Sequence, residues 1–193
     1  MKTIVFDTEG TGDKADRLCQ IAYIIRDGDM HDAKNFYFTV DSMNPYAQKV
    51  HGLSRFKLEE LSQGKRFKDS CEELYADFSV ADLIVGHNIK SDIKRLDGEF
   101  ARLGKHWVRK GTLCTMQHFN NAMQLNGVLG QRKYPRLSEL CGYYNVADDQ
   151  VLNMCHILFN AEGISSHDAR FDASATYLCL LAAKRVGDIR MVF

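Results

Sequence analysis

The chain of 193 residues carries 25 basic and 25 acidic residues, so its formal net charge is zero. Hydrophobic residues make up 45% and charged residues 26%, which is typical of a globular protein and excludes a disordered chain. The length suits one domain with a sizeable core, and we expect a single domain over residues 1–193. Zero net charge weighs against a nucleic-acid binder, although a carboxylate-rich site would cancel lysines and arginines elsewhere.

The six cysteines form no C-x-x-C pair, and most lie among apolar residues. We therefore expect buried free thiols and a reducing compartment. The N-terminal segment MKTIVFDTEG reaches a charged residue after three apolar ones, which excludes a signal peptide. No apolar run approaches the roughly 20 residues of a membrane span. These features predict a cytoplasmic protein with no membrane partner.

Three strands are predicted at the start of the chain. Residues 3–7 are apolar and end in acids, residues 18–26 are rich in isoleucine, and residues 34–40 alternate between apolar and polar side chains. A turn signal, Asp27–Gly28, separates the second strand from the third. We expect these strands to be neighbours in a meander.

Helices and two further strands are predicted over the rest of the chain. Helices are expected over residues 44–50, 58–61, 69–78, 88–103 and 137–144, strands over 82–86 and 112–115, and a loop over 124–134. Ser166 is the expected N-cap of a last helix that ends at residue 186. This order predicts an α/β fold with a mixed sheet covered by helices.

Two carboxylates, Asp7 and Glu9, lie one residue apart in FDTEGTG, at the end of the first predicted strand. Alternate residues of a strand face the same side, so both side chains can point at one place. Like charges this close repel unless a cation lies between them, and a hard divalent cation suits carboxylate oxygens. The pair is a candidate metal site, although a solvated polar turn would give the same pattern.

Asp92 in GHNIKSDIKRL, and His167 and Asp172 in SHDARFDASATY, are the other candidate functional residues. Asp92 falls in the first turns of a predicted helix, where an acid is favourable for that reason alone. His167 and Asp172 are five residues apart, whereas neighbours on a helix lie three or four apart. We therefore expect His167 in or just before the first turn, on a mobile segment, and Asp172 within the helix. A solvent-exposed histidine and a first-turn acid are the simpler alternative.

The four acids and the histidine, in this order, resemble the motifs of the DEDD exonuclease superfamily. The branch concerned has a histidine five residues before the last aspartate and includes the proofreading subunit of bacterial replicative DNA polymerase. The resemblance extends from Phe6 to Tyr177, and VHGLS at 50–54 and YPRLSEL at 134–140 also match family segments. It implies a ribonuclease-H-like fold, with a mixed five-stranded sheet in the order 3-2-1-4-5 flanked by helices.

The resemblance implies a magnesium-dependent 3′→5′ exonuclease that releases nucleoside 5′-monophosphates from the 3′ end of a nucleic acid. DNA is favoured, single-stranded or frayed. Asp7, Glu9, Asp92 and Asp172 would hold two Mg²⁺ ions, which Mn²⁺ could replace, with Asp7 bridging both. His167 would act as the general base toward the attacking water, a role that suits a side chain titrating near neutral pH. A DNA polymerase is the protein partner that the proofreading likeness suggests.

Two positions depart from the family pattern. Gly10 stands where the family often has a threonine, and Ser91 stands where an aromatic residue often precedes the second-motif aspartate. Both positions lie near the terminal nucleotide in the family, so they bear on substrate preference. By the same resemblance, the residues expected to contact the substrate are Thr8, Gly10, Thr11, His51 and Asn88.

Three alternatives remain open. The first is a 3′→5′ exoribonuclease, since discrimination depends on contacts to the 2′-hydroxyl group and no residue can be assigned to them. The second is a catalytically idle module that binds nucleic acid or a polymerase. The third takes His167 and Asp168 as the HD pair of an all-helical metal phosphohydrolase, which would make Asp168 essential in place of Asp172.

Overall fold

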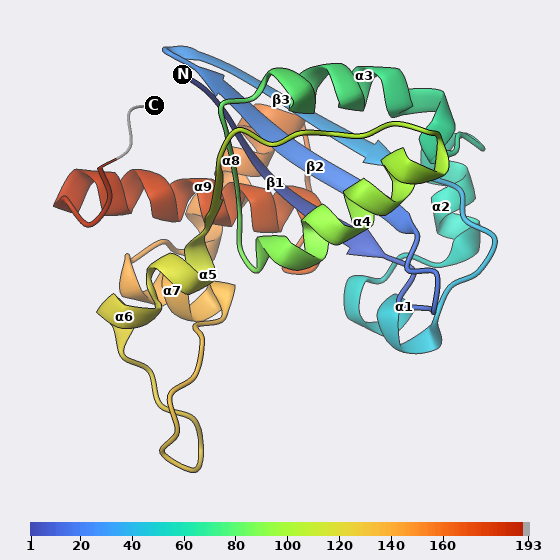
Figure 1. The fold of residues 1–193 in the computed structure, drawn as a ribbon. Coiled ribbons are helices and arrows are strands. Elements are labelled where there is room, and N and C mark those ends of the chain that lie inside the picture. The colour runs from blue at the N-terminus through green and yellow to red at the C-terminus, as the bar shows by residue number, and fades with distance from the viewer. Residues whose placement is uncertain (191–193) are drawn as a thin grey trace.

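The computed structural model describes residues 1–190, which form a five-stranded mixed sheet with helices on both faces (Figure 1). The strand order is β3-β2-β1-β4-β5. Strands β2 and β3 run antiparallel to their neighbours, whereas β4 pairs parallel with β1 and β5 pairs parallel with β4. The predicted α/β fold and its order 3-2-1-4-5 are confirmed.

The first half of the chain runs through β1 (Lys2–Gly10), β2 (Leu18–Asp27), β3 (Met30–Tyr37), α1 (Pro45–His51), α2 (Arg55–Ser62), α3 (Phe67–Val80), β4 (Leu83–Gly86) and α4 (Ile89–Arg102). The second half runs through β5 (Thr112–Cys114), α5 (Thr115–His118), α6 (Asn120–Met123), α7 (Leu137–Tyr143), α8 (Asp148–Phe159) and α9 (Ala169–Val186).

The central strand β1 is buried on both faces and determines where its side chains point. Ile4 and Phe6 belong to the apolar core that also contains residues of α3 and α4. Val5 belongs to a second core that contains residues of α9, which packs across β1 and β2. Because side chains alternate along a strand, Asp7 and Glu9 continue the face that α9 covers. The side chains of these two acids therefore lie next to the start of α9.

The last helix begins two residues later than a Ser166 N-cap would place it. Asp168 is the N-cap, and its carboxylate accepts a hydrogen bond from the backbone N–H of Arg170. His167 precedes the cap with a φ of 66°, which is outside the helical region, so the predicted Ser166 cap is wrong. The helix ends at Val186, as predicted, and Gly187 closes it in a left-handed conformation.

Helix α8 has no counterpart among the predicted elements. Val151 and Cys155, four residues apart, are buried on one face of this helix. Asp148 and Asp149 lie in its first turn, where acids are favourable. The spacing that predicts a helix is thus present in the sequence over residues 148–159 and was missed.

Two strands also differ from their predicted bounds. Strand β1 continues to Gly10, so Glu9 lies inside the strand, and the register with β2 shifts between Glu9 and Gly10. Strand β3 starts at Met30 and ends at Tyr37, although Phe38 beyond it is still buried in the core. The tight turn after Asp27 lets pairing with β2 begin earlier than the apolar pattern indicates.

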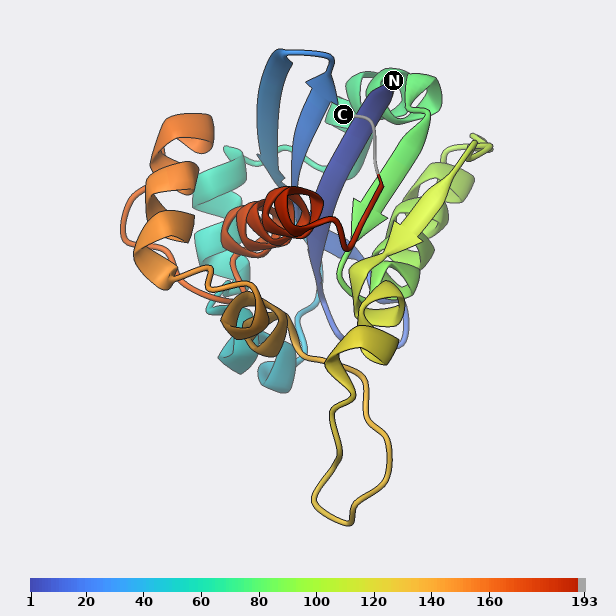
Figure 2. The same ribbon diagram turned by 90° about the vertical axis from the view of Figure 1, so that its left-hand side faces the viewer.

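The predicted loop over residues 124–134 projects from the body of the molecule (Figure 2). One isolated bridge, between Asn126 and Arg132, joins its two sides. All six cysteines are free thiols, as predicted. Within residues 1–190, no helix combines the length and the apolar character needed to cross a bilayer.

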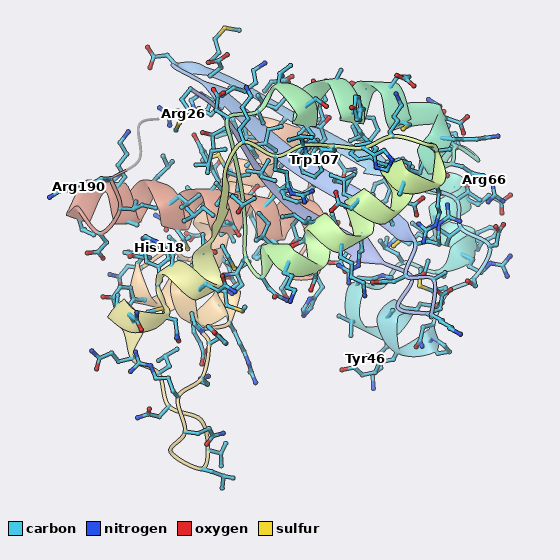
Figure 3. All side chains as sticks on the ribbon, viewed as in Figure 1. Arg26, Tyr46, Arg66, Trp107, His118 and Arg190 are labelled. Atoms are coloured by element: carbon cyan, nitrogen blue, oxygen red, sulfur yellow. The ribbon has the colours of Figure 1, made fainter. Side chains whose placement is uncertain are left out.

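Truncation of the buried residue Trp107 should destabilise the fold far more than truncation of an exposed aromatic residue. Its ring packs edge-on against Phe78 and Phe100, and its indole N–H donates to the Phe78 carbonyl oxygen over 3.2 Å. Trp107→Ala should lower the free energy of unfolding by about 3–5 kcal/mol in urea titrations. Tyr46 projects from the outer side of α1 (Figure 3), so Tyr46→Ala should change the free energy of unfolding by less than about 0.5 kcal/mol. Equal losses for both variants would contradict the packing role of Trp107.

Candidate active site

The carboxyl end of β1 and the N-terminal ends of α4 and α9 bring the four predicted acids together. Asp7 and Glu9 come from β1, Asp92 lies in the first turn of α4, and Asp172 lies in the first turn of α9. Asp7 is close enough to the other three carboxylates for each of them to perturb its ionisation. Three elements that are distant in sequence thus place four acids at one end of the central strand.

Glu9, His167 and Asp172 form the tightest part of this cluster. Each of the three offers one potential ligand atom, and these atoms all lie within 4.8 Å of one another. The backbone N–H of His167 donates to Oδ2 of Asp172 over 3.2 Å. His167 is exposed and lies outside the helix, whereas Asp172 is within it. The predicted placement of these two residues is therefore correct.

Asp92 is held by neighbours on the opposite side of the cluster. The hydroxyl of Thr8 donates to Oδ1 of Asp92 over 2.6 Å, and Nη1 of Arg95 lies 3.7 Å from the same oxygen. The Arg95 guanidinium also donates to the carbonyl oxygen and the hydroxyl of Thr8, over 3.3 and 3.2 Å. These bonds fix the Asp92 carboxylate beside β1.

Burial is the main reason why the pKa values of the four carboxyl groups are raised. Burial, together with the charges of Asp92, Asp172 and Glu9, raises the pKa of Asp7 well above its usual range. Burial and the nearby Asp172 raise the pKa of Glu9 to about 9. Burial raises the pKa of Asp92 to about 6 and that of Asp172 to about 6. Desolvation and mutual repulsion disfavour the charged form of these acids, and a nearby positive charge would stabilise it.

The donor set suits a hard divalent cation. Its members offer carboxylate oxygens, which magnesium and manganese prefer, and no cysteine lies in the cluster. The half-buried side chains of Asp7, Glu9 and Asp172 have no basic partner at ion-pair distance within residues 1–190, so their charge is left to be balanced. The residues present therefore fit a site for a divalent metal ion.

The five predicted substrate-contacting residues lie in different environments. The hydroxyls of Thr8 and Thr11 are both committed to hydrogen bonds, to Asp92 and to Asp13 respectively. Nδ1 of His51 accepts from the backbone N–H of Leu53, and its Nε2 is buried without a hydrogen bond of normal geometry, although the Gly10 backbone lies near. Asn88 is the N-cap residue of α4 and has a left-handed backbone, with a φ of 62°.

Arg95 is a functional candidate that the sequence-based prediction missed. A Cβ atom added at Gly10 would lie 2.4 Å from Nε of Arg95 and 2.5 Å from Oδ1 of Asp16. The guanidinium and its ion pair with Asp16 thus occupy the space that a side chain at position 10 would need. The spacing of Asp92 and Arg95, three apart on a helix, was the available signal. Glycine at position 10 therefore leaves the room that these two side chains occupy.

Asp168 is the N-cap of α9, and its carboxylate is paired with Arg170. It accepts from Nη2 and Nε of Arg170 over 2.7 and 2.9 Å, and from Nε2 of Gln20 over 3.0 Å. Burial alone would raise its pKa, but the Arg170 contacts hold that pKa below its usual range. The five-stranded sheet also excludes the all-helical phosphohydrolase fold. The alternative based on an HD pair at His167 and Asp168 is wrong.

A sheet of this order, with acids at the end of its central strand and on two helix N-termini, defines the ribonuclease-H-like class of metal-dependent nucleases. A family model described as RNase T, exonuclease, matches residues 4–180. The chain belongs to this exonuclease family. The prediction of an exonuclease-family enzyme is confirmed.

Solved structures similar to the chain include several forms of exonuclease I. Escherichia coli exonuclease I in complex with a dA16 oligonucleotide has a TM-score of 0.69 and 19% identity, over 95% of this chain and 41% of that one. The zinc-bound form of the E. coli enzyme with single-stranded DNA has a TM-score of 0.71 and 18% identity, over 95% and 40%. The moderately thermophilic enzyme of Methylocaldum szegediense has a TM-score of 0.63 and 17% identity, over 95% and 40%.

The chain thus spans about two fifths of the length of these structures, and the likeness defines its fold. Among curated proteins, none matches the chain at a significant level.

The stabilisation by Mg²⁺ should grow with pH. The pKa values of Asp92, Asp172 and Glu9 are raised above their unfolded values of about 4, so the metal-free fold loses stability as pH rises through about 6 and then 9. Because Mg²⁺ binds the deprotonated carboxylates, it replaces those protons. Millimolar Mg²⁺ should therefore raise the melting temperature more at about pH 8 than at about pH 5, as measured by differential scanning fluorimetry.

Asp172→Asn is the matched control for this measurement, because it keeps the side-chain shape and removes one charge. Its metal-free melting temperature should fall less with pH than that of the wild type, and its response to Mg²⁺ should be small. An Mg²⁺ response of equal size at both pH values in the wild type would refute the assignment of these acids as metal ligands.

Proposed function

We propose that the chain is a 3′→5′ exonuclease that removes nucleoside 5′-monophosphates from the 3′ end of single-stranded or frayed DNA. One observation carries the proposal: four desolvated carboxylates and one exposed histidine converge at the end of the central strand. Membership in the exonuclease family supports the same reaction class. The residues in question are Asp7, Glu9, Asp92, Asp172 and His167.

The four carboxylates would hold two Mg²⁺ ions, or Mn²⁺ in their place. When bound, such ions lower the pKa of a water molecule and neutralise charge at the leaving oxygen. Thr8 and Arg95 orient Asp92, so that its carboxylate does not turn away when the scissile phosphate arrives. The desolvated surroundings make these electrostatic interactions stronger than they would be in water.

His167 takes the proton from the attacking water in this proposal. Its side chain is within 4.8 Å of ligand atoms of Glu9 and Asp172, and it is exposed enough to pass the proton on to solvent. The hydrogen bond from its backbone N–H to Asp172 holds the backbone of His167 next to a proposed metal ligand. The left-handed backbone at φ 66° turns the chain so that His167 precedes the helix without extending it.

A groove of about 420 Å³ beside His167 is the proposed seat of the terminal nucleotide. Its lining includes His51, Leu53 and residues 162–168. Lys57 adds a positive charge, whereas Arg170 is paired with Asp168 over 2.7 Å, and Tyr37 adds an aromatic ring. A groove that combines a cation with aromatic and apolar side chains suits a nucleotide, since any base can stack and any phosphate can pair.

DNA is favoured over RNA because the similar solved structures include complexes of exonuclease I with single-stranded DNA. A 3′→5′ exoribonuclease is the alternative, since no described side chain is dedicated to a 2′-hydroxyl group. The suggested polymerase partner rests on the proofreading likeness alone.

The proposal is tested with one DNA strand labelled at either end, incubated with the protein and Mg²⁺. A 3′→5′ exonuclease should release the 3′ label at once as a mononucleotide, while the 5′-labelled strand shortens stepwise. Chelation of the metal should stop both. Matched single-stranded RNA and duplex DNA rank the substrates. Metal-independent binding without release of mononucleotides would identify an idle binding module instead.

His167→Ala should fold and lose roughly 10²–10⁴ in rate, the range of a general base. His167→Asn is the matched control for the backbone, because asparagine adopts the left-handed conformation more readily than alanine. Both variants should be equally inactive in the labelled-strand assay if the imidazole matters. Near-full activity of either variant would remove His167 from the mechanism, and recovery only in His167→Asn would assign it a backbone role.

A further inference from the structure

A second pocket, lined chiefly by basic residues, lies against α4 and the β1–β2 connection. It encloses about 270 Å³ and shares no lining residue with the groove beside His167. We call it the basic pocket, and the lining residues used below are Lys14, Asp16, Lys94, Arg95, Gly98 and Arg102. Four of these six carry a positive charge and one carries a negative charge, so the pocket is built for an anion.

Two of the four cations are available to a ligand. Lys14 and Lys94 are exposed, and neither makes an ion pair with any residue in the range 1–190. The two arginines are held in place: Arg95 pairs with Asp16 over 3.1 Å, and Arg102 donates to the carbonyl oxygen of Ala15 over 2.9 Å. The pocket thus combines two fixed guanidinium groups with two free ammonium groups.

The acid nearest to Arg102 does not cancel its charge. Arg102 lies 3.1 Å from Oε1 of Glu99, but that buried carboxylate already accepts two bonds from Arg17, over 2.6 and 2.9 Å. Arg17 alone balances Glu99, which leaves the charge of Arg102 in excess. Guanidinium groups with a fixed fork of donors are well suited to phosphate oxygens.

Gly98 lines the basic pocket and has no side chain to fill it. It is the residue between Lys94 and Arg102 on one stripe of α4, since the three are spaced by four. Glycine inside a helix is unfavourable relative to alanine, and its φ is not in the left-handed region, so the backbone does not require it. A Cβ at this position would have 3.6 Å to the nearest atom, Nη1 of Arg102, which is an ordinary contact. Alanine would therefore fit at position 98, and its methyl group would take up part of the pocket.

The basic pocket and the catalytic cluster share one side chain. Arg95 lines the pocket, and its Nη1 reaches Thr8 over 3.2 Å and Asp92 over 3.7 Å. Arg95 can thus contact an anion in the pocket while it also contacts Asp92 of the catalytic cluster. In a nucleic acid strand, the phosphate groups repeat along the chain, so a strand that occupies the cluster presents further phosphates to its surroundings.

We propose that the basic pocket binds a phosphate group of the nucleic acid strand on the 5′ side of the scissile bond. This inference rests on the proposed function, because it requires a strand in the catalytic cluster. Contacts to phosphate carry no base information, so the pocket holds any sequence equally. A free nucleoside 5′-monophosphate offers the same chemistry and is the other source of a phosphate group.

The test uses Lys14→Ala/Lys94→Ala, which removes only the two free cations. On a long single strand KM should rise about tenfold with kcat within about twofold. The slope of log affinity against log salt should fall by about 0.7, the value for one phosphate contact on a single strand. Hydrolysis of the p-nitrophenyl ester of thymidine 5′-monophosphate should stay unchanged, since this small diester has no further phosphate. Lys65→Ala/Lys68→Ala removes two exposed lysines outside the pocket and should behave as the wild type.

Gly98→Ala separates binding from folding. The extra methyl group should raise the melting temperature by about 2 °C, because alanine favours the helix, and yet should raise KM for the strand. A purely structural role for this position would not give opposite signs. Wild-type strand KM in both Lys14→Ala/Lys94→Ala and Gly98→Ala would overturn the proposal, as would an equal loss in Lys65→Ala/Lys68→Ala.

Two further measurements distinguish the possible failures. If the lysine variant weakens only inhibition by free thymidine 5′-monophosphate, the strand assignment is overturned and the phosphate site belongs to the product. If the wild type hydrolyses neither substrate, the proposed function fails. Fluorescence anisotropy of a labelled strand without metal then still tests the pocket, and equal affinity of wild type and lysine variant would overturn it.

Discussion

Four carboxylates that meet in a desolvated place repel one another, and the surrounding structure is arranged around that repulsion. Asp7 and Glu9 must point the same way, which the alternation of β1 ensures. Asp92 and Asp172 must enter from helix N-termini, where the backbone favours negative charge. The strand order places β4 beside β1, so that α4 starts next to the two acids of the strand.

The sequence predicted the fold and the acids well because both depend on local patterns. Apolar runs and helical spacing gave the strand and helix order, and the first-turn positions of Asp92 and Asp172 followed from the predicted helices. Each acid alone had a simple alternative explanation, and the set in its order carried the resemblance. The family assignment then followed over residues 4–180.

Long-range side-chain contacts were beyond a local pattern. The spacing of Asp92 and Arg95 could indicate a contact between those two, but only the folded chain shows Arg95 beside Thr8, Asp16 and the space at Gly10. The cap of α9 was misplaced for a similar reason. Ser166 and Asp168 are both good caps by residue type, and the contacts of Asp168 with Gln20 and Arg170 favour the later start. Helix α8, in contrast, had a readable pattern that was overlooked.

The crowding between Gly10 and Arg95 has a consequence for any change at position 10. A β-carbon there would meet Nε of Arg95 at 2.4 Å and Oδ1 of Asp16 at 2.5 Å, so both side chains would have to move aside. Because Arg95 also contacts Thr8 and Asp92, a larger residue at position 10 would disturb the support of the Asp92 carboxylate.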